Sequence, residues 1–330
     1  MELTSIGLGT YLGDADPDTD QRFAGAARQF AAGGGTVFDT AANYRMGRSE
    51  RALGQAFRDL PRDSYFISTK AGYLPMGDGM TPESPRAWFH RVLTAPGILG
   101  PDEVVDGCHA MTPRYLAHQL RVSLEALGVA RVDLFHLHNP EHQRPALGPE
   151  RFRAVLRKAF EACEDLAAQG LIGAYGCATW NGFRVPPEAP EHLGLETLME
   201  DARAAGGKDH HFRWIQLPLN LAMPEAFTRA TQSYGGERLT PLAAAQAAGL
   251  GVQVSASLMQ ARILDRLPTG PGAILPGCRT PAQAALQFAR CCPGVVTALC
   301  GMSRPGHVAE NLEVLGLPRA GAEALRELVG

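Results

Sequence analysis

Short apolar runs alternate along the chain with longer segments in which apolar residues recur every three or four positions. The short runs are rich in Val, Ile, Leu and aromatic residues, which is typical of strands covered on both faces. We therefore expect strands at residues 5–9, 36–39, 65–69, 132–138, 172–177, 213–217, 252–256 and 295–300.

The longer segments predict helices between these strands. Several begin with Ser, Thr or Asp and carry Pro near the first turn, which is a common helix start. The predicted helices span residues 20–32, 49–60, 113–127, 151–169, 195–205, 241–248 and 281–289. A β-then-α unit repeated through 330 residues favours an α/β fold, the eight-stranded parallel (β/α)8 TIM barrel, over an open doubly wound sheet. We expect one such barrel domain over residues 1–330.

Two segments are much longer than ordinary connections of about 2–6 residues. One spans residues 71–112, after the third predicted strand, and the other spans 219–240, before the helix at 241–248. Because the first leaves the carboxyl end of a strand, it should lie over the active face, where a long loop serves as a lid or substrate wall. A decorative insertion is the alternative.

Composition narrows the classes of function. The chain is 45% hydrophobic and 20% charged with a formal net charge of −3, so nothing favours binding to nucleic acid or to an acidic membrane. No run reaches the roughly 18 apolar residues of a membrane span, and no export signal begins the chain, so we expect a cytoplasmic protein. The 7 cysteines show no C-x-x-C pair, which favours reduced thiols over disulfides or a zinc site.

Polar residues lie at or just beyond the ends of three predicted strands: Asp39, Tyr44, Lys70 and His138. The carboxyl ends of the strands form the active face of a parallel barrel, so these side chains should meet. An unperturbed tyrosine has a pKa of about 10, and a nearby ammonium would make Tyr44 a better acid. Asp39 would keep Lys70 charged, and His138 would orient a carbonyl or relay the proton.

Each of these residues alone has an ordinary structural interpretation. Asp39 could cap a helix, and Tyr44 could be an aromatic residue at the rim of the barrel. Lys70 is harder to explain in this way, because a lysine seldom enters a barrel mouth without a partner. Together the four residues favour a site, since perturbed ionisable groups cluster at sites.

The same segments resemble the aldo/keto reductase family. DTAANY at 39–44 with GRSERALG at 47–54 resembles its second-strand signature, and STK at 68–70 its third-strand lysine. VDLFHLHNP at 132–140 is similar to its fourth-strand motif, and GMSRPGHVAENL at 301–312 to its adenosine-phosphate clamp. The resemblance implies an oxidoreductase that interconverts a carbonyl compound and its alcohol, with Asp39, Tyr44, Lys70 and His138 as catalytic residues.

A nicotinamide cofactor is also implied by this resemblance. Backbone N–H groups near Ser303 and the positive end of a helix starting near Pro305 can approach phosphate. Ser303 and Arg304 could hold a 2′-phosphate, which favours NADP(H) over NAD(H); a helix simply capped by Ser303 is the alternative. The expected cofactor residues are Thr10, Thr179, Gln216, Ser257, Leu258, Gln260, Gly301, Ser303, Arg304, His307 and Asn311.

Several positions depart from the family pattern. Ala178 and Thr179 stand where a Ser-Asn pair often holds the nicotinamide carboxamide. Gln216 is kept near the end of the sixth predicted strand, but Leu219 stands where the family often has a tyrosine whose ring stacks on the nicotinamide. These replacements predict an altered cofactor pocket. They also motivate a second hypothesis, a cofactor-sensing regulatory or binding subunit on the same barrel with little turnover.

His136 and His138 leave a third chemistry open, that of a metal-dependent barrel hydrolase. Spaced two residues apart on a strand, both side chains point to one face, but zinc needs further ligands and no other predicted strand ends in histidine. We therefore expect no metal and interpret His136 as a hydrogen-bonded histidine deeper in the barrel. Tyr11, Trp88 and Trp180 are candidate substrate walls, each with a plain packing or loop role as its alternative. The expected partner is a small carbonyl or alcohol compound of unspecified class.

Overall fold

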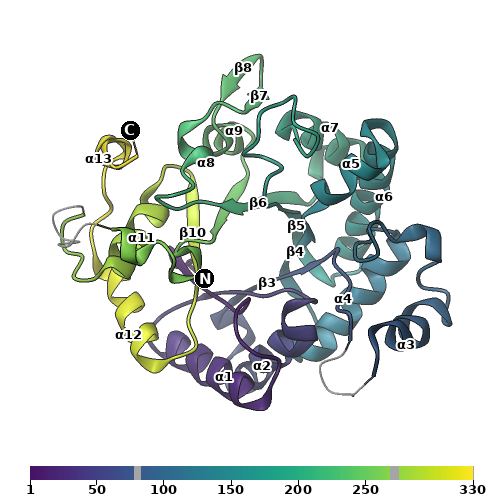
Figure 1. Ribbon diagram of the computed structural model, residues 1–330, viewed down its shortest axis with the longest axis horizontal. Coiled ribbons are helices and arrows are strands. Elements are labelled where there is room, and N and C mark those ends of the chain that lie inside the picture. Colours follow the sequence, from purple (N-terminus) through teal and green to yellow (C-terminus); the bar gives the residue numbers. More distant parts are fainter. Residues whose placement is uncertain (78–82, 268–274, 330) are drawn as a thin grey trace.

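The computed structural model describes residues 1–77, 83–267 and 275–329. Within them, parallel strands close into a barrel in the order β1-β10-β9-β6-β5-β4-β3-β2, and helices surround it (Figure 1). This confirms the predicted fold class. The barrel strands are β1 (Ile6–Gly9), β2 (Val37–Asp39), β3 (Phe66–Ala71), β4 (Val132–His138), β5 (Ile172–Ala178), β6 (Phe212–Pro218), β9 (Gly251–Ser255) and β10 (Val295–Gly301).

Side-chain caps fix the starts of several helices. Asp16 accepts the backbone N–H of Thr19 at 2.7 Å, so the first helix begins three residues earlier than its apolar pattern predicts. Thr112, Thr240 and Thr280 cap three others, each before a proline. The helices are α1 (Pro17–Ala32), α2 (Arg48–Phe57), α3 (Pro85–Phe89), α4 (Pro113–Leu127), α5 (Arg144–Leu147), α6 (Pro149–Ala168), α7 (Leu195–Gly206), α8 (Glu225–Thr228), α9 (Pro241–Ala247), α11 (Pro281–Cys291), α12 (Pro305–Glu313) and α13 (Ala322–Glu327).

Strand register sets the depth of the polar side chains. Asp39 pairs with Ser68 of β3, and two residues further along β3, Lys70 pairs with His136 of β4. His138, at the end of β4, pairs with Ala178 of β5. The carboxyl ends of neighbouring strands therefore meet at one end of the barrel, as the parallel topology requires.

The long segment 71–112 has a small apolar core of its own. Buried Leu74, Trp88, Leu93 and Leu99 pack together with Tyr115 of α4, apart from the main cluster between strands and helices. Figure 1 shows α3, in this segment, at the outer edge of the molecule beyond α4. The segment is thus a packed unit beside the barrel, although residues 78–82 lie outside the described residues.

The other long segment, 219–240, contains a hairpin that the sequence pattern does not predict. Its strands are β7 (Gln232–Tyr234) and β8 (Glu237–Leu239), which are too short for a clear alternation of apolar and polar residues. The turn is Gly235-Gly236, with φ of 61° and 83°. Glycine tolerates this left-handed backbone, so the glycine pair was the available signal.

Two general features complete the fold. In the described part of the chain, no helix is long and apolar enough to cross a membrane. All the cysteines are free thiols, and every one except Cys108 is buried.

Candidate active site

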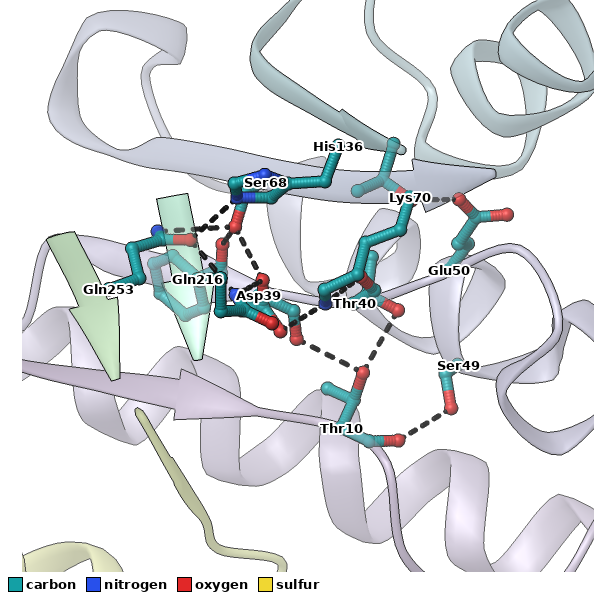
Figure 2. Close-up of polar contacts among 12 residues, drawn as sticks. Thr10, Asp39, Thr40, Ser49, Glu50, Ser68, Lys70, His136, Gln216 and Gln253 are labelled. Carbon is teal, nitrogen blue, oxygen red and sulfur yellow. Dashed lines mark hydrogen bonds and ion pairs between the residues drawn. The ribbon is translucent and has the colours of Figure 1, made fainter. Parts of the chain in front are cut away.

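A hydrogen-bonded network fills the carboxyl end of the barrel (Figure 2). Asp39 Oδ2 accepts from Lys70 Nζ at 2.6 Å, and Oδ1 accepts from Ser68 Oγ at 2.7 Å and from Gln216 Nε2 at 3.0 Å. Lys70 Nζ also donates to the backbone oxygen of Thr40 at 2.8 Å. The side chain of Lys70 is 0% exposed and that of Asp39 is 6% exposed, so solvent screens their attraction only weakly.

The network continues across the barrel to β4 and β9. Gln253 Oε1 accepts from Gln216 Nε2 at 3.0 Å and lies 3.1 Å from His136 Nε2. Burial, together with the Lys70 charge, lowers the pKa of His136 to about 4, so its ring is neutral and Nε2–H donates to Gln253. His136 is therefore a hydrogen-bonded histidine inside the barrel, as interpreted from the sequence.

The metal-hydrolase alternative gains no support from this geometry. His136 is engaged with Gln253. Over the described residues, no three His, Cys, Asp or Glu side chains are grouped so that they could hold a metal ion.

Tyr44 begins a 3₁₀ turn (Tyr44–Gly47) that follows β2. Its ring stands edge-on to Tyr11 at 5.0 Å and to His138 at 5.7 Å between ring centres. Lys70 Nζ lies 5.0 Å from the centre of the Tyr44 ring, although its hydrogen bonds go to Asp39 and Thr40 rather than to the Tyr44 hydroxyl. The cation therefore faces the ring instead of hydrogen-bonding the oxygen.

The pKa of Tyr44 moves opposite to the sequence-based expectation. Burial raises it well above 10, and the charges of Asp39 and Tyr11 act in the same direction. The lowering expected from Lys70 is therefore not found, and burial is the largest cause of the shift. Tyr44 thus stays protonated at neutral pH.

His138 is buried and neutral. Burial and the nearby Lys70 charge hold its pKa well below 6.5. Its backbone oxygen accepts a hydrogen bond from His109 Nε2 at 2.7 Å, and Gln143 Nε2 lies 2.9 Å from the other ring nitrogen of His109. Burial lowers the pKa of His109 to about 4, so this ring is also neutral. His109 thereby ties the segment 71–112 to the end of β4.

The structure brings together the four side chains expected to be catalytic, but sequence reasoning missed several of their neighbours. Ser68 and Gln253 complete the Asp39 network, and Glu50 of α2 accepts from Thr69 Oγ1 at 2.5 Å behind Lys70. A polar residue inside an apolar strand, such as Gln253 between Val252 and Val254, was the available signal.

Glu141, just after β4, holds the loop that follows β5. Its Oε1 accepts the backbone N–H groups of Trp180 at 2.7 Å, Asn181 at 3.0 Å and Gly182 at 3.2 Å. Burial raises the pKa of Glu141 to about 7 despite these three bonds. One buried carboxylate therefore fixes the segment that carries Trp180 at the barrel mouth.

Glu141→Gln should make stability less dependent on pH. With a pKa of about 7 in the folded chain against 4.5 unfolded, the folded state binds the proton more tightly, so the free energy of unfolding falls as pH rises from about 4.5 to 7. The free energy of unfolding of the variant, measured relative to that of wild type, should therefore rise by on the order of 2–3 kcal/mol between pH 5 and pH 8. Urea unfolding at both pH values measures this. Parallel pH curves for Glu141→Gln and wild type would contradict it, and the exposed Glu237→Gln is the control.

The expected cofactor residues fall into two groups. Thr10, Thr179 and Gln216 are buried in or beside the network; Thr10 Oγ1 donates to Thr40 Oγ1 at 2.9 Å. A second group lies at the ends of β9 and β10, where Ser257 is buried, Leu258 and Ser303 are half-buried, and Gln260, Gly301, Arg304 and His307 are exposed.

Asn311, which was expected to contact the cofactor, is buried. Its Nδ2 donates to Cys300 Sγ at 3.4 Å and to Met302 Sδ at 3.6 Å. Asn311 therefore supports the end of β10 and the loop after it from the protein interior. The helix α12 begins after Arg304, and no side chain among the described residues caps it, so the Ser303-cap alternative is wrong.

The three positions that depart from the family pattern, Ala178, Thr179 and Leu219, are all buried. Leu219 is fully buried in the main apolar core, so it offers no surface at the mouth. Ala178 is buried between His138 and Gln216. The neighbouring Thr179 donates its backbone N–H to the Gln216 oxygen at 2.8 Å, which leaves the ends of β5 and β6 closely joined.

Two of the three candidate walls stand at the mouth. Tyr11 follows β1 and is 57% exposed, and Trp180 follows β5 and is 48% exposed. Trp88 is buried in the small core of the segment 71–112, which corresponds to the packing alternative.

Comparison with known proteins gives one family. A model described as "Aldo/keto reductase family" matches residues 5–195. The chain is 32% identical over 139 residues to a D-threo-aldose 1-dehydrogenase of a Pseudomonas species, covering 42% of this chain and only 38% of that protein. It is 23% identical to a putative voltage-gated potassium channel subunit beta of Schizosaccharomyces pombe, covering 84% and 74%.

Solved structures share the fold. An aldo/keto reductase from Klebsiella pneumoniae, in complex with NADP and acetate, superposes with a TM-score of 0.63 at 24% identity, covering 99% of this chain and 90% of that one. The likeness extends the shared barrel well beyond the residues matched by the family model.

Proposed function

The chain belongs to the aldo/keto reductase family, and on that premise we propose that it is an NADP(H)-dependent oxidoreductase that interconverts an aldehyde or ketone with its alcohol. The observation that carries the proposal is the Tyr44 ring edge-on to His138 and next to the buried Lys70–Asp39 pair. Burial raises the pKa of Tyr44 and lowers that of His138.

Reduction of a carbonyl leaves negative charge on its oxygen, and this oxygen must receive a proton. When bound, NADP(H) supplies or accepts the hydride. Tyr44 donates its hydroxyl proton to the oxygen in reduction and takes it back in oxidation. Lys70 stabilises the resulting phenolate, and Asp39 keeps Lys70 protonated against the burial that lowers the pKa of its amine.

His138 has a different role in this proposal. Because burial keeps the ring neutral, it offers one N–H donor and one acceptor rather than a positive charge. We assign it the orientation of the carbonyl oxygen toward Tyr44, whose ring lies against it.

The residues at the ends of β9 and β10 fit a dinucleotide phosphate. These strands are neighbours in the barrel, so the loops after them share one edge. Ser257 Oγ is buried with no partner among the described residues. The uncapped start of α12 adds free N–H groups and a positive dipole end. Arg304 supplies an exposed cation there, which supports NADP(H).

Arg304→Ala should change the preference between cofactors. Loss of a charge-assisted contact to the 2′-phosphate is expected to weaken NADPH binding by about tenfold or more and to leave NADH binding unchanged. Fluorescence titration with each cofactor measures this. Arg229→Ala, at another exposed arginine, is the control; equal weakening of both cofactors by Arg304→Ala would contradict the assignment.

The proposed activity is tested by mixing the purified protein with NADPH and a panel of aldehydes and ketones, and with NADP⁺ and alcohols. Sugars belong in the panel because one relative is named an aldose dehydrogenase. Oxidation or reduction of the cofactor is followed by absorbance. No turnover in either direction, together with no cofactor binding, would overturn the proposal.

A second candidate function is a cofactor-binding regulatory subunit. It is favoured by the likeness to a putative potassium channel subunit beta over most of the chain. It predicts retained cofactor and negligible turnover with every compound in the panel, which separates it from the enzyme.

A further inference from the structure

Two consecutive non-glycine residues after Tyr44 adopt a left-handed backbone. Arg45 has φ 51° and ψ 39°, and Met46 has φ 56° and ψ 43°. A left-handed backbone is strained for residues with a side chain, so the turn needs support from its surroundings. The Met46 side chain is exposed, whereas that of Arg45 is 1% exposed. Arg45 is therefore the residue through which the turn is held.

The Arg45 guanidinium reaches across to the segment between β1 and α1. Nε donates to the Asp14 backbone oxygen at 2.7 Å, and one terminal nitrogen donates to the Asp16 backbone oxygen at 3.1 Å and to Asp20 Oδ1 at 2.6 Å. The guanidinium also lies 5.6 Å from the centre of the Phe23 ring. These charge-assisted bonds are largely shielded from water and correspondingly strong.

The segment held by Arg45 is otherwise weakly attached. Within the described parts of the chain, the bond from Arg45 to Asp14 is the only hydrogen bond to the backbone of residues 11–15. The same segment carries Tyr11, which is largely exposed but whose ring stands edge-on against Tyr44. The Arg45 side chain thus connects the turn that begins at Tyr44 to the segment that carries Tyr11.

We propose that Arg45 is a positioning residue that fastens residues 11–16, and with them Tyr11, over Tyr44. The inference deepens the proposed function and rests on it. Fastening keeps Tyr11 against the phenol, limits water beside it and fixes the substrate wall relative to the proton donor. The buried ion pair with Asp20 also offsets the backbone strain of the turn.

Three variants separate the effect of the Arg45 hydrogen bonds, here called the fastening, from the effect of the left-handed backbone strain. Arg45→Met removes the fastening and keeps a non-glycine residue in the strained position. Arg45→Gly removes the fastening and relieves strain, and Met46→Gly relieves strain one residue later while keeping the fastening. Asp20 remains paired with Arg48 at 2.5 Å in all three, so no carboxylate is left buried without a partner and the variants should fold.

Limited digestion with chymotrypsin gives a readout independent of activity, because the exposed Tyr11 and Leu12 lie in this segment. Cleavage within residues 11–16 should be at least about tenfold faster in both Arg45 variants than in wild type, because local opening becomes easier, and Met46→Gly should match wild type. An unchanged cleavage rate in Arg45→Met would overturn the proposal. Equal acceleration in Met46→Gly would also overturn it, since strain rather than fastening would then control the segment.

Kinetics test the link to the reaction. Arg45→Met and Arg45→Gly should lower kcat by about tenfold and raise KM for the carbonyl compound, as expected for a displaced proton donor and wall, with the dissociation constant for NADPH unchanged. If both Arg45 variants keep the kcat and KM of wild type, the proposed positioning role is wrong. A wild-type protein without turnover would instead count against the proposed function, and the digestion experiment would still decide the fastening.

Discussion

Tyr44→Phe is expected to lower kcat by about 10²–10⁴-fold while NADPH binds with nearly wild-type affinity. The size follows from the loss of a positioned general acid. The affinity should be retained because the proposed phosphate contacts come from the loops after β9 and β10 and do not include the Tyr44 hydroxyl. Phenylalanine keeps the edge-on contacts with Tyr11 and His138. The variant should therefore fold normally, and its loss should appear in kcat.

Tyr73→Phe is the matched control for this experiment. The Tyr73 ring also stands edge-on to His138, at 5.2 Å between ring centres, and its hydroxyl lies 3.4 Å from His142 Nδ1. Removal of that hydroxyl should change kcat by only a few-fold, because it is not in the proposed proton path. If Tyr44→Phe keeps wild-type turnover, or if Tyr73→Phe loses as much, Tyr44 is not the acid. A wild-type protein that binds NADPH without turnover would favour the regulatory subunit.

Lys70→Met should abolish measurable turnover and destabilise the fold by about 3–5 kcal/mol. The destabilisation arises because Asp39 would keep a negative charge in a nearly dry site with its ammonium partner removed. The turnover is lost because the phenolate of Tyr44 would form beside Asp39 without the cation at 5.0 Å from its ring.

The double variant Asp39→Asn/Lys70→Met separates these two effects. It removes both charges, so most of the stability should return, while turnover should stay absent. Urea unfolding at neutral pH and the NADPH assay measure the two properties on the same samples. A double variant that is as unstable as Lys70→Met would show that the charge pair is not the source of the loss.

Much of the fold could be predicted because a parallel barrel repeats one local pattern. The strand β4 (Val132–His138) is found at its predicted bounds, since it is an apolar run buried on both faces. Other bounds shift by one to three residues where a cap or a cross-strand bond decides them, as Asp16 does for α1. The hairpin β7–β8 was missed because its three-residue strands carry no periodic signal.

The site was predictable only as far as strand ends identify it. Asp39 and Lys70 end neighbouring strands, so their meeting follows from the topology. Gln216, 177 residues from Asp39 along the chain, meets it only because the barrel closes, which a linear pattern does not contain. The direction of the Tyr44 pKa shift was missed for a similar reason, since the burial of the phenol and its proximity to Asp39 depend on the assembled site.

The separate small core of the segment 71–112 has a consequence for how this protein can change. Its apolar side chains pack against one another and Tyr115 rather than into the main cluster, so substitutions there should be nearly additive with substitutions in the barrel. Successive replacements could therefore rebuild the segment 71–112, and the barrel beside it would retain its folding stability.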